Sequence, residues 1–368
     1  MKFKILKTTL LTGLNKVNHV VNNKSPIPSL NGIYFRLDSS SLTLIGSDSD
    51  ITIKCLIEKD LEIIKQGKIV IPKFIVEIIR KIDDEWVDLE LIDNSLIIIK
   101  SMKSEFKING INADNYPNID FSLSGDRFEI EADLINSIIL ETAFASSQEE
   151  IRPVLTGVNF NCFNNRLTCV ATDSFRLAKK EIELATNLEF NVNVPAKCLS
   201  EVLKISKEDE KIEVYISQQR ILFNFENIII QSRLINGNYP DISRLIPNDF
   251  KSILKVNKKV IQDSLERANI LSLNSINYTV TLEKNSSLLT LSSKSQEVGS
   301  IQENVSYLNF EGEEAILLSF NSRYVIDALK AIKEDIVNFY FNGPMDPFII
   351  KAEEIDSSTQ LILPIKTY

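Results

Sequence analysis

The sequence has few of the residues on which metalloenzymes and secreted proteins depend. Its 368 residues include one histidine, one tryptophan and four cysteines. A single histidine excludes a metal site built from several histidines, and no two cysteines have the C-x-x-C spacing of a thiol-ligated metal. Each cysteine lies in an apolar segment, which predicts buried free thiols in a reducing compartment. Glycine and proline, at 11 residues each, are too scarce for long disordered linkers.

Long apolar runs are also missing. No uninterrupted apolar stretch reaches the roughly 18 residues that a membrane-spanning helix requires. The opening segment resembles the charged start of a signal peptide, but Lys7, Thr8, Thr9 and Thr12 interrupt its apolar run. We therefore expect a cytoplasmic protein that has no membrane partner. Its length allows two or three domains, and 44% hydrophobic and 25% charged residues are ordinary values for a globular protein.

Several segments recur along the chain at a nearly constant offset. The matched pairs are Asn115–Ile119 with Asn238–Ile242 and Ile71–Ile82 with Val194–Ile205, both at an offset of 123, and Pro28–Phe35 with Pro153–Phe160 at an offset of 125. The apolar spacing of Ser319–Ile332 fits a third copy. Three matches in one order predict a repeated domain. We place the three copies at residues 1–124, 125–248 and 249–368.

Each copy has the pattern of two amphipathic helices and several short strands. Apolar residues at steps of three and four predict helices at Lys7–Lys24, Lys73–Ile82, Glu131–Ser147, Pro195–Lys207, Asn257–Asn269 and Asn321–Lys333. Strand-like runs include Leu42–Ile45, Leu96–Ile99, Ile221–Phe225 and Leu288–Leu291, with turns at Asp93-Asn94 and Glu226-Asn227. The fold class is therefore α+β, with two helices against antiparallel strands in every domain.

Charge is divided unevenly between these elements. The formal net charge is −9, which taken alone argues against a nucleic-acid partner. Over the six helical spans, however, Lys and Arg exceed Asp and Glu by 7, so the rest of the chain holds 16 more acids than bases. A surface that gathers these helices would attract duplex DNA. The alternative is that Lys and Arg are simply good helix formers. Base readout is not expected, because no helix carries a cluster of Arg, Asn and Gln.

No catalytic signature is present. The sequence contains no G-x-G-x-x-G, Walker or G-x-S-x-G motif. His19 lies in a predicted amphipathic helix, which favours a structural or solvent-exposed role. Asp48, Asp50 and Asp173 could in principle hold Mg²⁺, but Asp50 and Asp173 stand at the 123-residue offset, which favours a structural turn. We expect no metal, no cofactor and no enzymatic activity.

The stretch around Asp173 is the most distinctive in the chain. An apolar strand is followed by Thr172, Asp173 and Ser174, then by Phe175, Arg176 and Leu177. Short polar side chains that bond the local backbone predict a tight turn. One interpretation is a turn with a solvated arginine. The other is a surface pocket with apolar walls and one fixed cation, suited to the end of an amphipathic peptide. The first copy has Asp50-Ile-Thr-Ile at the 123-residue offset, so Ser174, Phe175 and Arg176 would be additions of the second copy.

Four segments resemble the bacterial DNA polymerase III β sliding clamp family. They are Ala171–Leu177 (Ala-Thr-Asp-Ser-Phe-Arg-Leu), Arg152–Gly157, Gly237–Asp241 and Leu361–Lys366, and the match spans the whole chain in order. The resemblance implies a head-to-tail homodimer that closes a ring of six domains, with helices lining the hole and sheets outside. Double-stranded DNA would pass through without sequence readout. The ring would tether the replicative DNA polymerase, and a clamp loader would open and close it with ATP that the clamp does not bind.

The resemblance also implies a pocket for short clamp-binding motifs of partner proteins, which carry a Gln and a terminal Leu/Phe pair. The matching positions are Leu155, Thr172, Ser174, Phe175, Arg176, Leu177, Pro240, Arg244, Leu245, Asn321, Tyr324, Met345, Pro347, Leu361, Leu363, Pro364, Ile365 and Lys366. Leu177, Leu245, Leu363 and Ile365 would bury the apolar side chains of the motif. Ser174-Phe175 replaces the common Gly-His, and Leu363–Lys366 replaces Met-Pro-x-Arg. Both departures bear on which peptides would bind. In the second, the compact ammonium of Lys366 replaces a planar guanidinium that can donate two parallel hydrogen bonds.

Two further sets of residues follow from the resemblance. Phe106 and Ile108 match one edge of the dimer interface, and Ile270 and Leu271 match the other. The candidates for facing DNA are Lys24, Lys73, Arg80, Arg152 and Lys197. The second hypothesis for the chain is a repeat-built protein-interaction scaffold that does not encircle DNA, which the acidic total would suit.

Overall fold

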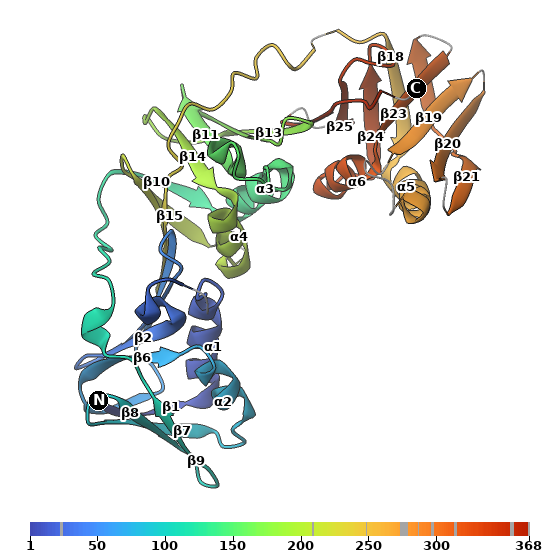
Figure 1. Cartoon of the computed structure of the whole chain (residues 1–368). Coiled ribbons are helices and arrows are strands. Elements are labelled where there is room, and N and C mark those ends of the chain that lie inside the picture. The colour runs from blue at the N-terminus through green and yellow to red at the C-terminus, as the bar shows by residue number, and fades with distance from the viewer. Residues whose placement is uncertain are drawn as a thin grey trace. The chain divides into compact units, whose positions relative to one another are not determined.

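The computed structural model describes residues 1–22, 25–207, 210–247, 249–272, 279–285, 287–295, 298–312, 315–353 and 357–366 (Figure 1). Contacts group the chain into two compact units. The first contains residues 1–133 and 197–234, and the second contains residues 134–196 and 235–368. Both units combine helices with antiparallel sheets, so the predicted α+β class is confirmed.

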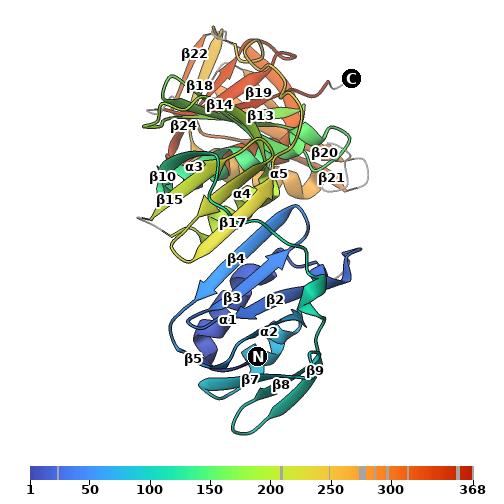
Figure 2. The same cartoon turned by 90° about the vertical axis from the view of Figure 1, so that its left-hand side faces the viewer.

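The described residues of the first unit form two sheets. The smaller has the strand order β5 (Leu61–Lys65), β1 (Lys2–Leu6), β7 (Trp86–Ile92), β8 (Leu96–Lys100) and β9 (Glu105–Asn109). The larger has the order β10 (Asp126–Glu131), β15 (Lys211–Ile216), β16 (Arg220–Asn224), β17 (Ile228–Arg233), β4 (Ile51–Ile57), β3 (Leu42–Ser47), β2 (Gly32–Leu37) and β6 (Gly67–Pro72). Every pairing in these sheets is antiparallel, and Figure 2 shows β2, β3 and β4 side by side.

The second unit also holds two sheets. The larger has the order β14 (Phe190–Pro195), β11 (Gly157–Phe163), β12 (Arg166–Thr172), β13 (Arg176–Glu183), β26 (Ser358–Ile362), β25 (Phe348–Ala352), β24 (Ile336–Phe341), β18 (Ser252–Asn257) and β22 (Asn309–Gly312). The smaller has the order β21 (Gly299–Asn304), β20 (Leu288–Ser295), β19 (Thr279–Asn285) and β23 (Ala315–Asn321). All four predicted strand runs are confirmed as β3, β8, β16 and β20.

In the described part of the chain, six α-helices overlap the six predicted spans. They are α1 (Lys7–Asn18), α2 (Ile75–Lys81), α3 (Ala132–Thr142), α4 (Ala196–Ile205), α5 (Lys258–Ser272) and α6 (Ser322–Ala331). Short 3-10 turns lie at Pro28–Asn31, Ala113–Asn115, Ala143–Ala145 and Pro153–Thr156. The predicted extension of α1 to Lys24 is wrong, because the helix ends at Asn18. The residues that follow include His19, Val20 and Val21, which have low helix propensity.

Helix α1 packs closely on the larger sheet of the first unit. Its buried residues are Leu10, Gly13, Leu14 and Val17. A side chain on Gly46 of β3 would place its Cβ 2.1 Å from the Val17 carbonyl oxygen, so only glycine permits this approach. Below the helix, β3 and β4 are buried along most of their length, and Figure 2 shows α1 against them. The predicted amphipathic face is therefore the core face.

One backbone hydrogen bond recurs at the start of the first helix in each repeat. The amide of the first helical residue donates to a carbonyl that precedes a strand, over 2.8 Å in each case, at Lys7–Glu85, Ala132–Glu210 and Lys258–Asp335. These pairs stand 125 or 126 residues apart along the chain. The same hydrogen bond at the same place in each copy supports the repeat that the sequence predicts. The predicted limits at 1–124, 125–248 and 249–368 remain predictions.

The sheets join neighbouring repeats, which the sequence did not indicate. Strand β4 pairs with β17, which lies about 180 residues further along the chain. Strand β13 pairs with β26, again about 180 residues away. Neither pairing has a signature in the local pattern, because strand partners so far apart are chosen by tertiary packing.

Two smaller predictions, on the cysteines and on the Asp93-Asn94 turn, are also confirmed. The four cysteines are free and buried, and burial raises the pKa of the Cys198 thiol to about 12, so this thiol stays protonated. Asp93 and Asn94 have φ of 51° and 61°, as a tight hairpin turn requires. Among the described residues, no helix is long and apolar enough to cross a membrane.

Candidate functional site

The stretch around Asp173 forms a tight turn between β12 and β13, as predicted. One Asp173 carboxylate oxygen accepts from the amides of Phe175 (2.9 Å) and Arg176 (3.0 Å). The Thr172 hydroxyl donates to the Arg176 carbonyl (2.6 Å) and accepts from the Ser174 amide (3.1 Å). Ser174 has φ of 79°, in the left-handed region. Short polar side chains therefore hold the turn in shape.

Arg176 lies at the centre of the site, and its side chain is only 13% exposed. Its guanidinium donates to the carboxylates of Asp173 (3.0 Å) and Asp327 (2.7 Å) and to the carbonyl of Phe144 (2.7 Å). The Arg176 Cζ atom also lies 4.6 Å from the ring centre of Tyr324 and 5.3 Å from that of Phe144. Arg176 is thus neither solvated nor an open cation for a ligand. Its hydrogen bonds connect β13 to α6 through Asp327 and to the turn after α3 through the Phe144 carbonyl.

An apolar cluster lies beside this arginine. Leu177 and Leu361 are partners across the β13–β26 pairing and are only 2% and 3% exposed. They pack with Val170 and Ile349, and Tyr239 and Leu363 lie against the same cluster. Leu177 and Leu361 therefore form a buried apolar floor beneath the side chains around them.

Several other residues of the predicted set are more exposed. Leu245, Met345 and Phe175 are 49%, 53% and 60% exposed. The other exposed members of the predicted set are Ser174, Pro240, Arg244 and Lys366, while Asn321, Tyr324, Pro347, Leu363, Pro364 and Ile365 are half-buried. Leu155 is buried in the 3-10 turn Pro153–Thr156. Phe175 lies in the turn that leads to Leu177, and a large exposed apolar side chain so close to an apolar floor is typical of a peptide-binding surface.

The C-terminal segment is held in place by backbone bonds. The Leu363 amide donates to the Phe175 carbonyl (2.9 Å), and the Ile365 amide donates to the Ser319 carbonyl (2.6 Å). Asn321 begins α6, where its side chain accepts from the Arg323 amide (3.0 Å). The two backbone bonds thus tie Leu363 to the turn that contains Phe175 and Ile365 to the end of β23.

Two tyrosines at the site have raised hydroxyl pKa values. The Tyr239 hydroxyl accepts from the Thr172 amide (2.9 Å), and burial raises the pKa of Tyr239. Burial, with the Asp173 carboxylate nearby, also raises the pKa of Tyr324. Both hydroxyls therefore remain protonated and neutral near pH 7.

Sequence reasoning missed the partners of Arg176. Asp327 and Tyr324 stand three residues apart on α6, so both can face the same guanidinium. That spacing was the one available signal. Phe144 contributes a carbonyl and a ring face, and nothing in the local pattern of residues 143–145 indicated this role.

A second buried ion pair lies along β13. The Lys180 ammonium contacts both carboxylate oxygens of Glu141 at 2.9 and 3.0 Å, and the two side chains are 11% and 8% exposed. The Gln360 amide donates to the backbone carbonyl of Glu141 (3.0 Å). Glu141 is one of the acids in the charge sum over the six predicted helical spans, but its carboxylate is neutralised inside the unit by Lys180.

The first repeat contains a counterpart of the Asp173 turn. Asp48, not Asp50, accepts from the amides of Asp50 (3.0 Å) and Ile51 (2.8 Å). The Ser49 amide donates to the Ser47 hydroxyl (3.2 Å), and Ser49 has φ of 91°. The equivalence of Asp50 with Asp173 is therefore wrong. The true offset at this turn is 125, which makes Asp50 the counterpart of Phe175 and Ile51 the counterpart of Arg176.

The same offset places other residues opposite one another. Ser49 corresponds to Ser174, so Ser174 belongs to the shared turn and is not an addition of the second repeat. Asp48 and Asp173 both bond the backbone of their own turns, which supports the structural interpretation of these carboxylates over a Mg²⁺ site. Among the described residues, no group of three or more metal-binding side chains is present.

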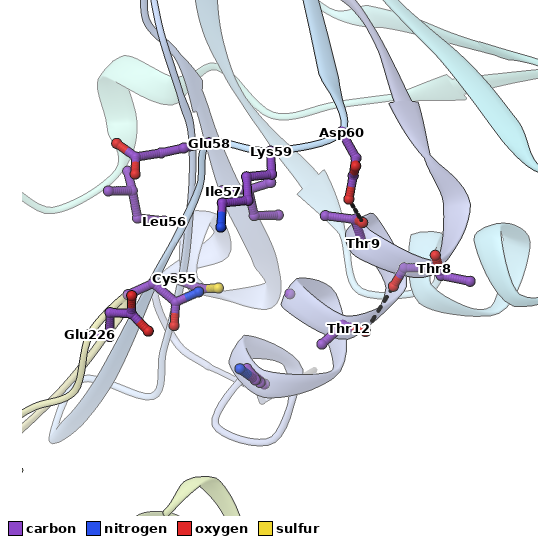
Figure 3. Close-up of a pocket in the computed structure, with 13 residues that line it drawn as sticks. Thr8, Thr9, Thr12, Cys55, Leu56, Ile57, Glu58, Lys59, Asp60 and Glu226 are labelled. Atoms are coloured by element: carbon purple, nitrogen blue, oxygen red, sulfur yellow. Dashed lines mark hydrogen bonds between the residues drawn. The ribbon is translucent and has the colours of Figure 1, made fainter. Parts of the chain in front are cut away.

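A hollow of about 430 Å³ lies beside α1 in the first unit (Figure 3). Gly13, Lys16 and Cys55 line it, at the positions that Ile138, Glu141 and Lys180 occupy in the second repeat. In Figure 3 the threonines of α1 lie opposite the end of β4, and the Thr9 hydroxyl donates to Asp60 (2.7 Å). Where the second repeat has a buried ion pair, the first has open space.

The candidate DNA-facing residues lie in different environments. Lys73 and Lys197 line one hollow of about 500 Å³ in the first unit, together with His19. Lys73 donates to the Val21 carbonyl (2.8 Å), and Arg80 pairs with Glu77 (2.5 Å). Arg152 and Lys197 are exposed, and Lys24 lies outside the described residues. The structure thus brings Lys73 and Lys197 together.

The candidate dimer residues lie in the smaller sheets or beside them. Phe106 and Ile108 are half-buried on β9, the last strand of its sheet. Ile270 is 64% exposed and Leu271 is half-buried at the end of α5, which packs on β20 and β21. Strand β21 is likewise the last strand of its sheet. An unpaired edge with apolar side chains is a typical site for pairing with another chain.

Comparison with known proteins agrees with this architecture. Residues 1–120, 129–241 and 243–366 match, respectively, the N-terminal, central and C-terminal domains of the DNA polymerase III beta subunit. The Beta sliding clamp of Staphylococcus epidermidis is 38% identical over 377 residues, with both chains fully covered. The chain belongs to the DNA polymerase III beta subunit family.

Solved structures of the family are similar along the whole chain. The DNA polymerase sliding clamp from Bacillus subtilis is 36% identical, with a TM-score of 0.95 and full coverage of both chains. The beta subunit from the DNA polymerase of Streptococcus pyogenes is 33% identical, with a TM-score of 0.94 and full coverage. The three matched segments confirm the threefold organisation that the internal repeat predicted.

Proposed function

We propose that this chain is a DNA sliding clamp that gives processivity to the replicative DNA polymerase. The observation that carries the proposal is the full-length similarity to sliding clamps, together with a threefold repeat in the chain itself. The role is non-catalytic and belongs to a polymerase holoenzyme in the cytoplasm. No cofactor is required, because the clamp loader supplies the ATP-dependent step.

The assembled form in this proposal is a ring of two chains. Each chain contributes three clamp domains, with limits near 1–124, 125–248 and 249–368. Edge strand β9, with Phe106 and Ile108, would meet the region of Ile270 and Leu271 in the second chain. Duplex DNA would pass through the ring beside helices, where backbone phosphates offer charge without base readout. Lys24, Lys73, Arg80, Arg152 and Lys197 are the candidates for these contacts.

Retention on DNA of different topology tests the proposal. A closed ring loaded on nicked circular plasmid should stay bound, and linearisation should release it from the ends. A protein-interaction scaffold that does not encircle DNA would be retained on neither form. Binding that is unchanged by linearisation would also contradict the ring, because ordinary charge attraction does not depend on the ends of the DNA.

The dimer is tested by one matched pair of variants. Ile270→Asp places a charge on an apolar side chain that is 64% exposed, and sedimentation should then show monomer. Leu317→Asp is the control, because Leu317 is 57% exposed on β23, at the opposite edge of the same sheet from β21. A dimer that survives Ile270→Asp would mean that the interface lies elsewhere.

The same proposal assigns the turn at Thr172–Leu177 to partner binding. Motif peptides of the polymerase, the clamp loader and other partners would place apolar side chains over the floor of Leu177 and Leu361. The exposed Phe175, Leu245 and Met345 would contact them. Truncating Leu177 would also disturb the core, since it is only 2% exposed, so surface residues make better tests.

A labelled pentapeptide that begins with Gln and ends in Leu-Phe is a suitable probe. Leu245→Ala should weaken its binding by about tenfold, as expected for loss of an apolar contact worth about 1.4 kcal/mol. Ile64→Ala is the control, because Ile64 on β5 is 59% exposed and lies outside the proposed site. Equal affinity for wild type and for Leu245→Ala and Phe175→Ala would place the peptide elsewhere.

A further inference from the structure

A third hollow, of about 330 Å³, opens in the first unit beside the turn at Ser47–Thr52. Its lining includes Ile27, Leu30, Asp50, Thr52, Gln231 and Arg233. The segment Pro117–Asp120 forms a further wall. This hollow lies wholly within the first unit and shares no residue with the Arg176 site.

The framework of this hollow repeats that of the Arg176 site. Leu30 and Pro117 are the counterparts of Leu155 and Pro240 in the two repeats. The strand pairing is also equivalent, because the Arg233 amide donates to the Asp50 carbonyl (3.1 Å) as the Leu363 amide does to Phe175 (2.9 Å). A hollow in this place is therefore a product of the duplication.

The floor of the hollow differs in chemistry. Thr52 and Gln231 are partners across the β4–β17 pairing, as Leu177 and Leu361 are across β13–β26. The Gln231 side-chain oxygen is buried and has no hydrogen-bond partner among the described residues. A buried acceptor without a donor is destabilising, and a ligand that supplies a donor would relieve it.

The charged side chains of the hollow largely cancel. Arg233 and Asp50 lie 4.0 Å apart, and both are more than 70% exposed. Arg220 is held by the Asp120 carbonyl (2.6 Å), the Asp120 carboxylate (3.1 Å) and serine oxygens of the following segment. Neither sign of charge prevails, so a neutral polar group fits better than an ammonium or a carboxylate.

We propose that this hollow binds an extended peptide segment that inserts a carboxamide side chain, Gln or Asn. On binding, the Gln231 side chain turns so that its oxygen, which is buried in the unliganded chain, accepts from the NH2 group of the carboxamide. The aliphatic part of the side chain packs on Ile27, which is 41% exposed, and on Ile119. The chain thereby has two peptide sites of different chemistry, an apolar one at Leu177 and a polar one at Gln231.

The test uses the full-length protein and three capped tripeptides. Acetyl-Ala-Gln-Ala-amide should cause saturable shifts of the Ile27 and Ile119 methyl signals in NMR spectra. The same peptide with Leu or Glu in the centre should bind at least tenfold more weakly. Equal binding of the Leu peptide, stronger binding of the Glu peptide, or no saturable shift with the Gln peptide would each overturn the proposal.

Gln231→Leu is the decisive variant. It installs the residue type of the counterpart position, Leu361, and removes the unpaired oxygen, so the melting temperature should not fall. Shifts caused by the Gln peptide should disappear in this variant and persist in Phe175→Ala, which alters only the other site. Shifts that survive Gln231→Leu would overturn the proposal, while the clamp activity could still stand.

Discussion

The turn at Ser47–Thr52 in the first repeat and the turn at Thr172–Leu177 in the second share their backbone hydrogen bonds. In both, an aspartate accepts from the amides two and three residues ahead, and a hydroxyl accepts from the amide of a serine with positive φ. The next two side chains differ completely, because Asp50 and Ile51 correspond to Phe175 and Arg176. The duplicated chain has kept the residues that bond the turn and changed the two residues that follow them.

The neighbouring contacts differ in the same way. The Tyr239 hydroxyl bonds the Thr172 amide, whereas the hydroxyl of its counterpart Tyr116 is buried and has no partner among the described residues. Glu141 and Lys180 form a buried ion pair, whereas Lys16 and Cys55 line a hollow. The second repeat therefore has more specific polar contacts around its turn than the first. Variants of paired positions can test that contrast.

We expect the largest loss of folding stability when the buried ion pair of Lys180 and Glu141 is broken. Lys180→Met leaves the Glu141 carboxylate 8% exposed without its partner and should cost about 3–5 kcal/mol. Lys16→Met, at the counterpart of Glu141, should change stability by less than about 0.5 kcal/mol, because it removes no ion pair among the described residues. Native-state hydrogen exchange of α3 and β13 measures the first effect. Equal protection in both variants would contradict the contrast.

A somewhat smaller loss of folding stability is expected when Arg176 is replaced, and almost none when Arg233 is replaced. Arg176→Ala removes bonds to two carboxylates and a carbonyl and should destabilise the second unit by about 2–4 kcal/mol. Arg233→Ala acts on a guanidinium that is 75% exposed, so its effect should be below about 0.5 kcal/mol. Calorimetric melting of the two variants compares them. A similar loss at both positions would mean that Arg176 does not fasten β13 to α6.

Replacing Tyr239 with Phe should lower the stability of the fold, whereas the same replacement at Tyr116 should not. Tyr239→Phe leaves the Thr172 amide without an acceptor and should cost about 1–2 kcal/mol. Tyr116→Phe removes a hydroxyl that has no described partner, so it should be neutral or stabilise by up to about 1 kcal/mol. Urea unfolding of both variants provides the measurement. A loss at Tyr116 as large as that at Tyr239 would show that its hydroxyl is satisfied in solution.

The smallest change in folding stability is expected when the serine with positive φ is replaced by glycine, and it should be the same in both repeats. Ser49→Gly and Ser174→Gly relieve a positive φ of 91° and 79°, but glycine also loses more conformational entropy on folding. The two terms should leave each variant within about 0.5 kcal/mol of wild type. A calorimetric difference between the two variants larger than this would show that the turns are not equivalent.

Much of the local structure could be predicted from the sequence. Asp173, Thr172 and Ser174 predicted a tight turn because the bonds that hold it lie within four residues. The helices followed from apolar spacing, although α1 ends at Asn18, earlier than predicted. The equivalence of the two turns was misplaced by two residues, because the offset of 123 from other segments does not hold at this turn.

The threefold repeat, the α+β class and the shape of the Asp173 turn could be predicted from the amino-acid sequence, because each is recognised from short local patterns of residues. The surroundings of that turn, by contrast, depend on how distant elements pack. The pairing of β13 with β26 brought Leu361 and Leu363 to Leu177, and the packing of α6 brought Asp327 to Arg176. Partners about 150 residues apart leave no periodic trace in a sequence, since they are chosen by complementary surfaces of folded elements.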